Sequence, residues 1–295
     1  MLLLPFIFFL YRCSLLTAGY TKISPDDPGS LQSAILAANQ QQGLDYVIIP
    51  PGIYRISPVS DQRASLQFAN LKNLTINAKD ATLLMMDNTK AGVYFANCYN
   101  VTLRGSVTIR NAIIPFTQDY IESIDGNSLV IKIHDGYPTT LDDPLAFHVA
   151  TTYYVFDRTT RRLKDNTYDY YSTNVTRLDA SRFRVLFGSI FGKEVSVGDL
   201  FSMRSGIGGT AMHSDNCERM QFTDVNIEYA GGLAWFETGG AGNHRYERIT
   251  ARTGSKPIGA TENPLMSANA DGFHSAGVHR GPTIIDSLFT RMPDD

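Results

Sequence analysis

Three aspartates near the end of the chain have types and spacing that could support hydrolysis. Asp271 lies in the segment SANADGFHS, and Asp294 and Asp295 follow it by 23 and 24 residues. Clustered carboxylates repel one another, so one of them is expected to stay protonated while another is ionised. A proton donor beside an ionised base is what cleavage of a glycosidic bond needs, and the inverting version holds a water between them. Aspartates at this spacing could therefore converge on one patch and cleave a glycosidic bond.

Each aspartate taken singly also has an ordinary explanation, since Asp271-Gly272 is a common turn pair and acidic corner residues are often only solvated. The neighbouring His274 favours a site, because an imidazole can hydrogen-bond a sugar hydroxyl or tune a carboxylate. A tryptophan could offer a platform for a sugar, although a sole tryptophan is more often part of a core. The candidate substrate-binding residues are Asn269, His274, Trp235, Lys256 and Arg280.

Composition and spacing exclude several other functions. The net charge is −3 and no block of lysines or arginines occurs, so nucleic acid is not an expected partner. His213, His244 and His279 show no recognisable metal-binding spacing with cysteines or acids, so neither a metal nor a cofactor is expected. Carbohydrate remains the expected partner.

A repeated pattern predicts how the aspartates are brought together. The segments FANLKNLTIN, from Phe68, and FANCYNVTLR, from Phe95, are offset by 27 residues. Three later segments align if Phe222, Tyr246 and Ile285 are equivalent, with spacings of 24 and 39 residues. Short strands recurring in this way predict a parallel β-solenoid, in which residues one coil apart stack at roughly 4.8 Å. An antiparallel β-sandwich is the alternative, but it gives no reason for the repetition.

The segment before the repeat predicts a cap. Leu31, Ala34, Ile35 and Ala38 recur at helical spacing behind Ser30, which could cap the start of a short helix. The following DYVIIPPGIYRI predicts two short strands broken at Pro50, Pro51 and Gly52.

The repeat disappears between Thr117 and Leu200. Alternating segments with turn pairs at Asp125-Gly126 and Asp135-Gly136 predict antiparallel hairpins, and hence a β-rich insertion between coils. Its tyrosines either pack this insertion or form a sugar-stacking surface. They are Tyr153, Tyr154, Tyr168, Tyr170 and Tyr171.

The N-terminus and the sequons predict a secreted glycoprotein. An apolar run from Leu2 to Leu10, too short to span a bilayer comfortably, precedes small residues at 17–19. We expect a signal peptide over residues 1–19, an extracellular location and no membrane contact after cleavage; a signal anchor or a mis-assigned start are the alternatives. Glycosylation is expected at Asn73, Asn100 and Asn174. Cys98 and Cys217 predict either one disulfide or two buried thiols.

Two motifs resemble known families. VIIPPGIY after a leading helix resembles the N-terminal coil of pectin-lyase-fold proteins, which are right-handed parallel β-helices acting mostly on polysaccharides. NADGFHS followed by PDD is similar to the polygalacturonase pattern, and is closer still to the α-1,3-galactosidase β-helix family. The resemblance is specific only over the last 30 residues or so, and Ala270 stands where polygalacturonases have threonine. It implies inverting hydrolysis by three aspartates, here Asp271, Asp294 and Asp295.

The expected fold is therefore all-β, a right-handed parallel β-helix with an N-terminal capping helix and a β-rich insertion. Its expected divisions are the signal peptide (1–19), the cap and first coils (20–116), the insertion (117–200) and later coils carrying the site (201–295). Stopping at Asp295 leaves the last coil uncovered, so we expect a fragment that aggregates or is inactive when expressed alone. The complete protein is expected to be a monomer.

Two other functions remain open. A polysaccharide lyase would need a basic residue or Ca²⁺ near the site, and Arg280 and Lys256 could contribute the basic group. A non-catalytic solenoid for adhesion or glycan binding would use aromatic residues such as Trp235 as platforms.

Overall fold

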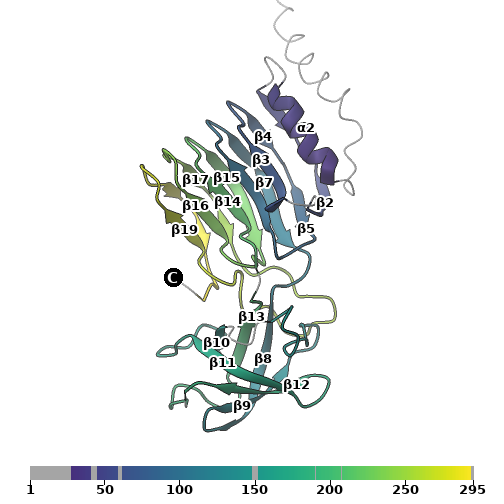
Figure 1. Ribbon diagram of the computed structural model, residues 1–295, viewed down its shortest axis with the longest axis vertical. Coiled ribbons are helices and arrows are strands. Elements are labelled where there is room, and N and C mark those ends of the chain that lie inside the picture. Colours follow the sequence, from purple (N-terminus) through teal and green to yellow (C-terminus); the bar gives the residue numbers. More distant parts are fainter. Residues whose placement is uncertain are drawn as a thin grey trace, which may run out of the picture.

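The computed structural model describes residues 28–40, 45–58, 62–147, 152–189, 191–206 and 208–293 (Figure 1). Within these ranges the chain forms one helix, α2 (Pro28–Gln40), and otherwise strands. The predicted signal peptide, Asp294 and Asp295 lie outside the described residues. The all-β prediction is confirmed for the described part of the chain.

One sheet has five strands, all parallel. Neighbouring strands pair in the order β3-β6-β14-β16-β19. The strands are β3 (Ala64–Ala69), β6 (Ala91–Ala96), β14 (Met212–Asp215), β16 (Trp235–Thr238) and β19 (Phe273–Ala276).

The second sheet has ten strands and is also parallel throughout, which excludes the antiparallel sandwich for this part of the chain. Its main path is β1 (Tyr46–Ile48), β4 (Thr75–Asn77), β7 (Thr102–Asn111), β15 (Gln221–Glu228), β17 (Arg245–Glu247) and β20 (Thr283–Ile285). The flanking strands are β2 (Gly52–Ile56), β5 (Ala81–Met85), β18 (Thr250–Ala251) and β21 (Leu288–Phe289). From β3 onward, each strand of the five-stranded sheet is followed by strands of the ten-stranded one.

The Phe-Ala-Asn repeat has a structural cause. Phe68 pairs with Phe95 and Ala69 with Ala96, as the 27-residue offset predicts. The asparagine that follows turns the chain out of the sheet, because Asn70 and Asn97 take φ values of 60° and 52°, a region that asparagine tolerates better than most residues. Asn216, which directly follows β14, takes the same conformation. Its Nδ2 donates to Asn97 Oδ1 at 2.6 Å.

The predicted register of the later segments is confirmed between β15 and β17 and is wrong between β17 and β20. Phe222 pairs with Tyr246, as predicted, but Tyr246 pairs with Ile284 and not with Ile285. The loop between these strands is therefore one residue shorter than the alignment assumed. Because side chains alternate along a strand, that single residue moves Ile285 to the opposite face of the sheet.

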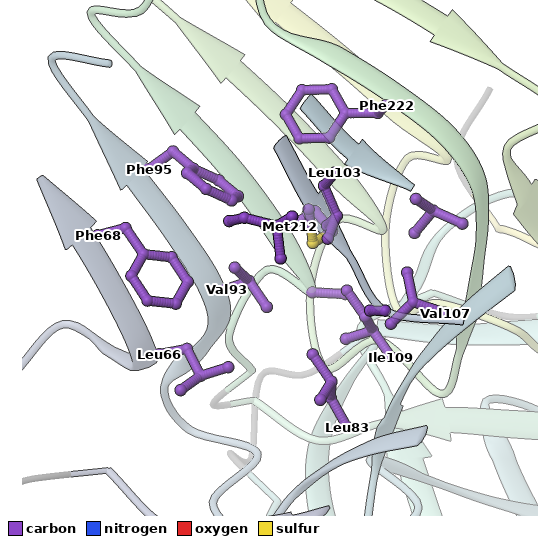
Figure 2. Packing of buried hydrophobic residues seen from close by; sticks show 14 of the residues in the cluster. Leu66, Phe68, Leu83, Val93, Phe95, Leu103, Val107, Ile109, Met212 and Phe222 are labelled. Carbon is purple, nitrogen blue, oxygen red and sulfur yellow. The ribbon is translucent and has the colours of Figure 1, made fainter. Parts of the chain in front are cut away.

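Both sheets share one apolar core. Figure 2 shows Phe68, Phe95 and Phe222 following one another between the sheets. Their ring centroids are 5.4 Å apart for Phe68 and Phe95, and 5.9 Å apart for Phe95 and Phe222. The column continues through Trp235, whose ring lies 4.6 Å from Phe222 and 5.0 Å from Tyr246. Stacking of neighbouring strands thus buries apolar area that one strand could not bury alone.

Helix α2 covers one edge of this core. Leu31, Ala34 and Ile35 are buried, as the helical spacing predicts. Gln32 Oε1 accepts a hydrogen bond from the Gln67 N–H at 3.0 Å, which joins the helix to the outermost strand of the five-stranded sheet. The helix begins at Pro28, so the prediction of Ser30 as the cap is wrong: proline suits the first helical turn, where its missing N–H costs nothing.

The β-rich region between β7 and β14 is a closed, antiparallel six-stranded barrel, which lies below the two sheets in Figure 1. Its strands pair in the order β10-β11-β12-β9-β8-β13 and close on β10. They are β8 (Phe116–Asp125), β9 (Ser128–Ile133), β10 (Thr152–Phe156), β11 (Tyr170–Arg177), β12 (Arg182–Phe187) and β13 (Leu200–Arg204). Closure leaves no free strand edge.

One predicted hairpin exists and the other does not. Asp125 pairs with Ser128, so the first turn joins β8 and β9. Gly136 does lie in a turn, with φ of 80°, but β9 then pairs with β12 and no hairpin forms there. This glycine is needed for close approach instead, because an added Cβ would lie 2.5 Å from the Ala260 nitrogen.

Most of the tyrosines in this region pack the barrel. Tyr153, Tyr154 and Tyr170 are buried, whereas Tyr168 and Tyr171 are exposed. A sugar-stacking surface made of all five is therefore excluded.

The two described cysteines are buried thiols rather than a disulfide. The Cys98 N–H points at Cys217 Sγ at 3.3 Å, since the two residues occupy equivalent places in neighbouring layers.

The barrel interior contains an uncompensated carboxyl group, which predicts a pH effect on stability. Asp119 is fully buried, neither of its oxygens has a partner among the described residues, and burial raises its pKa well above the usual range. A raised folded-state pKa means that stability is highest below the unfolded-state pKa and is lost as pH rises towards the folded-state value. We expect Asp119→Asn to raise the thermal midpoint at pH 7 by a few degrees, and by less at pH 4.

Asp199 provides the matched control. It is also buried in this region, but it accepts from Lys164 Nζ at 2.5 Å and from the Ser196 N–H at 2.8 Å. Asp199→Asn should lower the midpoint at pH 7, because Lys164 loses its ion pair. Equal effects of the two substitutions at both pH values would contradict the assignment of Asp119 as an unpaired acid.

Candidate functional site

Asp271 and His274 form a close pair where the chain enters β19. His274 Nδ1 lies 2.5 Å from Asp271 Oδ2, and their side chains are 44% and 21% exposed. The Asp271 carbonyl accepts from the Ala234 N–H at 2.9 Å and the Gly272 carbonyl from the Trp235 N–H at 3.1 Å. The Asp271-Gly272 pair therefore continues the sheet ladder. Both functional groups reach solvent from a rigid backbone.

His274 ends a row of rings on the outer face of the five-stranded sheet. In register across four strands lie Tyr94, His213, Phe236 and His274. Successive ring centroids are 4.9, 4.8 and 5.3 Å apart. Tyr94 is buried, His213 and Phe236 are partly exposed, and His274 is the most open. We call these four residues the aromatic row.

Polar groups border the far end of the aromatic row. Tyr94 Oη donates to Asp215 Oδ2 at 2.6 Å, and Thr238 Oγ1 to Asp215 Oδ1 at 3.1 Å. His213 Nε2 lies 2.8 Å from the same Thr238 hydroxyl. Burial, then the Asp215 carboxylate, raises the pKa of Tyr94 to about 12, and burial lowers the pKa of His213. The row thus ends in a hydrogen-bonded polar network.

Two of the predicted substrate-binding residues are structural. Trp235 is 0% exposed, so it packs the core and cannot offer a platform to a sugar. Asn269 is also buried; its Nδ2 donates to the Pro115 carbonyl at 2.7 Å and to the Gly231 carbonyl at 2.9 Å. Asn269, two residues before Asp271, therefore links the chain that enters the barrel at Pro115 to the chain that enters β16 at Gly231.

The two predicted basic residues are exposed, and they belong to other segments of the chain than Asp271. Lys256 belongs to the segment between β18 and β19, and its Nζ donates to the Thr261 carbonyl at 3.2 Å. Arg280 lies in the corner after β19, pairing with Gly242, whereas Asp271 precedes the strand.

The chain leading to Asp294 and Asp295 runs beside the segment that carries Asp271. The Ser267 N–H donates to the Arg291 carbonyl at 2.9 Å, and the residues of that contact are 24 positions apart. Gly272 allows close packing against this part of the chain, since an added Cβ would lie 2.9 Å from Phe289 Cβ. The two terminal aspartates themselves lie outside the described residues, so their convergence with Asp271 stays a prediction.

The three sequons are exposed, but two of them interact. Asn100 Nδ2 donates to Asn73 Oδ1 at 2.8 Å, and the two residues occupy equivalent corners one strand spacing apart. A glycan on each would crowd the other, whereas Asn174 lies by itself on β11. Expressed in a glycosylating secretory host, the protein should carry at most two N-glycans. Intact-mass spectrometry checks this, and a species with three glycans would contradict it.

Among the described residues, no group of three or more His, Cys, Asp or Glu side chains could hold a metal ion. In the same ranges, none of the helical structure is long and apolar enough to cross a membrane.

Sequence reasoning missed most of the aromatic row. Tyr94, Phe236 and Asp215 are unremarkable in their own segments, and the sequence raised His213 only as a candidate metal ligand. The signal that could have found them is the repeat itself: Tyr94 immediately precedes Phe95, and the three other rings occupy the same register position.

Comparisons with known proteins give little further guidance. No family model matches the chain, and no curated protein matches it. A solved structure of a putative glycosyl hydrolase from Parabacteroides merdae matches with a TM-score of 0.34 and 11% identity, covering 90% of this chain and 89% of that one. With similarity this low, function cannot be carried from one chain to the other.

Proposed function

We propose that this protein is a glycoside hydrolase built on a right-handed parallel β-helix, and that Asp271 belongs to its catalytic site. The observation that carries the proposal is the Asp271–His274 pair at the open end of the aromatic row. A carboxylate alone would be an ordinary surface group. A carboxylate held by a ring that continues a row of other rings has the two parts that hydrolysis of a sugar chain needs, a reacting acid and a binding surface.

The proposed mechanism gives each residue a role. An Nδ1–H donated by His274 would fix the orientation of the Asp271 carboxylate, as required of a base that activates water. Asp294 or Asp295 would protonate the leaving oxygen from the other side, and the remaining aspartate would help to hold the water. The product would then have the inverted anomeric configuration.

The aromatic row supports a carbohydrate as the bound molecule. Ring faces present apolar area with polar tips, a combination suited to sugars, which have apolar C–H faces and polar edges. His213 and Phe236 are partly exposed at successive strand positions, so a saccharide would run across the strands. We also propose an extracellular, glycosylated protein, which the apolar run at Leu2–Leu10 and the exposed sequons support; a monomer is proposed as well.

The direct test is release of product from candidate substrates. Protein expressed from its complete coding sequence is incubated with α-galactosides and with oligogalacturonides, and products are separated by chromatography. We expect hydrolysis in one of the two classes, without new ultraviolet absorbance. Products that absorb in the ultraviolet would carry the double bond left by a lyase and would overturn the hydrolase.

The aromatic row alone favours a second candidate function, a non-catalytic glycan-binding protein. In that case the rings bind sugar and Asp271 only shapes the corner before β19. Saturable binding of a saccharide with no product after prolonged incubation would select this function.

A further inference from the structure

The chain that leads to Asp271 crosses from the barrel to the sheets. It comprises residues 262–269, which we call the strap. Leu265 and Met266 are fully buried in the apolar cluster of the barrel, whereas Ala268 belongs to the cluster between the two sheets. Asp271 follows the end of the strap by two residues. The way in which the strap is fixed therefore limits where Asp271 can lie.

Gln118 of β8 binds the main chain of the strap through both ends of its side-chain amide. Its Nε2 donates to the Asn263 carbonyl at 3.0 Å, and its Oε1 accepts from the Leu265 N–H at 2.8 Å. The amide thus pairs with the groups on either side of Pro264, as the main chain of a neighbouring strand would. Gln118 and Leu265 are both 0% exposed, so loss of the amide would remove the acceptor of a buried N–H.

The other end of the strap is fixed to the same part of the barrel. Asn269 Nδ2 donates at 2.7 Å to the carbonyl of Pro115, three residues before Gln118. The strap therefore lies along the start of β8 in the opposite direction, with a hydrogen bond near each of its ends. Beyond the strap, the Asp271 carbonyl accepts from the Ala234 N–H at 2.9 Å. A continuous path of contacts thus joins Gln118 to Asp271.

We propose that Gln118 is a positioning residue for Asp271: by holding the strap, it sets the place of the Asp271 carboxylate relative to a saccharide on the aromatic row. The barrel thereby acts on the reaction through the strap. Reacting groups must be held to within about 1 Å, so a small shift of the strap is enough to lower the rate. The inference rests on the proposed function for the claim that Asp271 reacts.

Two variants of Gln118 test this role. Gln118→Met keeps the length of the side chain and removes the amide. Arg161 still donates to the Asn263 carbonyl at 2.6 Å in that variant, so the strap should loosen without leaving the barrel. Gln118→Asn keeps an amide but is shorter by one methylene group, so it cannot make both bonds to the strap. This milder change carries the test if Gln118→Met does not fold.

Asn127→Leu is the matched control. Asn127 also has a side-chain amide on a main-chain group, because its Nδ2 donates to the Phe187 carbonyl at 2.7 Å. That bond joins the turn between β8 and β9 to the end of β12, so it lies within the barrel. Its loss should have no effect at Asp271.

Hydrogen exchange followed by mass spectrometry reports on the place of Asp271 without a substrate. The Ala234 N–H exchanges when its bond to the Asp271 carbonyl opens. We expect Gln118→Met to speed exchange at Ala234 by about 10-fold, the equivalent of one lost buried hydrogen bond. Exchange at Val93 should stay unchanged, because its N–H donates to the Ala211 carbonyl at 2.9 Å, two strands away in the same sheet.

Turnover gives the second readout. On the substrate of the unaltered protein, Gln118→Met should lower kcat by about 10- to 100-fold and leave KM nearly unchanged, because the aromatic row that binds the saccharide keeps its place. Gln118→Asn should change exchange at Ala234 and kcat in the same direction by less. Asn127→Leu should change neither.

Exchange at Ala234 that matches the Asn127→Leu control, or that rises equally at Val93, would overturn the inference. An unchanged kcat in both Gln118 variants would overturn it as well. Faster exchange at Ala234 in a protein that hydrolyses no saccharide would support the coupling of Gln118 to Asp271 while overturning the hydrolase. Hydrolysis by a protein in which neither Gln118 variant changes exchange or kcat would do the reverse.

Discussion

Asp271→Asn is expected to reduce turnover by about 100- to 10,000-fold while leaving the fold intact, because an amide cannot accept the proton of an attacking water. The substitution keeps the size of the side chain and leaves the Asp271 carbonyl bonded to the Ala234 N–H at 2.9 Å. Initial rates on the substrate found for the unaltered protein give the effect on turnover, and the thermal midpoint reports on the fold.

Asp80→Asn controls for loss of a surface carboxylate. Asp80 is exposed and has a φ of 55°, which asparagine tolerates, so both activity and stability should be retained. Asp271→Asn protein that turns over as fast as the Asp80→Asn control would remove Asp271 from the mechanism.

Trp235→Ala is expected to destabilise the protein by about 3–5 kcal/mol, the usual cost of deleting a large aromatic side chain from a core. The indole is fully buried and lies 4.6 Å from the Phe222 ring and 5.0 Å from the Tyr246 ring, so its removal leaves a cavity. Urea denaturation measures the loss, and Trp235→Phe should lose less because a ring is retained.

Fluorescence checks the same placement without mutation. The chain has one tryptophan, so its emission reports on Trp235 alone. Emission should be blue-shifted, resistant to acrylamide and unchanged by saccharide. Strong quenching by acrylamide, or a small effect of Trp235→Ala on stability, would restore the sugar-platform interpretation.

Local patterns predicted much of the fold. The apolar spacing of Leu31, Ala34 and Ile35 identified the helix, and the Phe-Ala-Asn repeat identified equivalent strands because each of its residues has a fixed task in a strand or a corner. The displaced partner of Tyr246 shows the limit, since a loop of unknown path separates that strand from the next. Closure of the barrel depends on pairing between β10 and β13, which are remote in sequence and carry no turn signal.

The site was only partly predictable for a similar reason. Asp271 and His274 are three residues apart, so a short motif could reveal them. Phe236 and His213 join them only through the register of strands that are remote in sequence. The sequence left Trp235 open between a core position and a sugar platform, and its complete burial identifies the core position.

Proton NMR of the anomer released first tests the central claim most directly. The unaltered protein and the Asp271→Asn variant are incubated with the substrate that is turned over, and the anomeric signals are followed before mutarotation mixes them. Inverting hydrolysis predicts that the first product has the configuration opposite to that of the bond cleaved, and that the signal is lost in the variant. A first product that retains the configuration, or that appears equally fast with Asp271→Asn, would contradict the account.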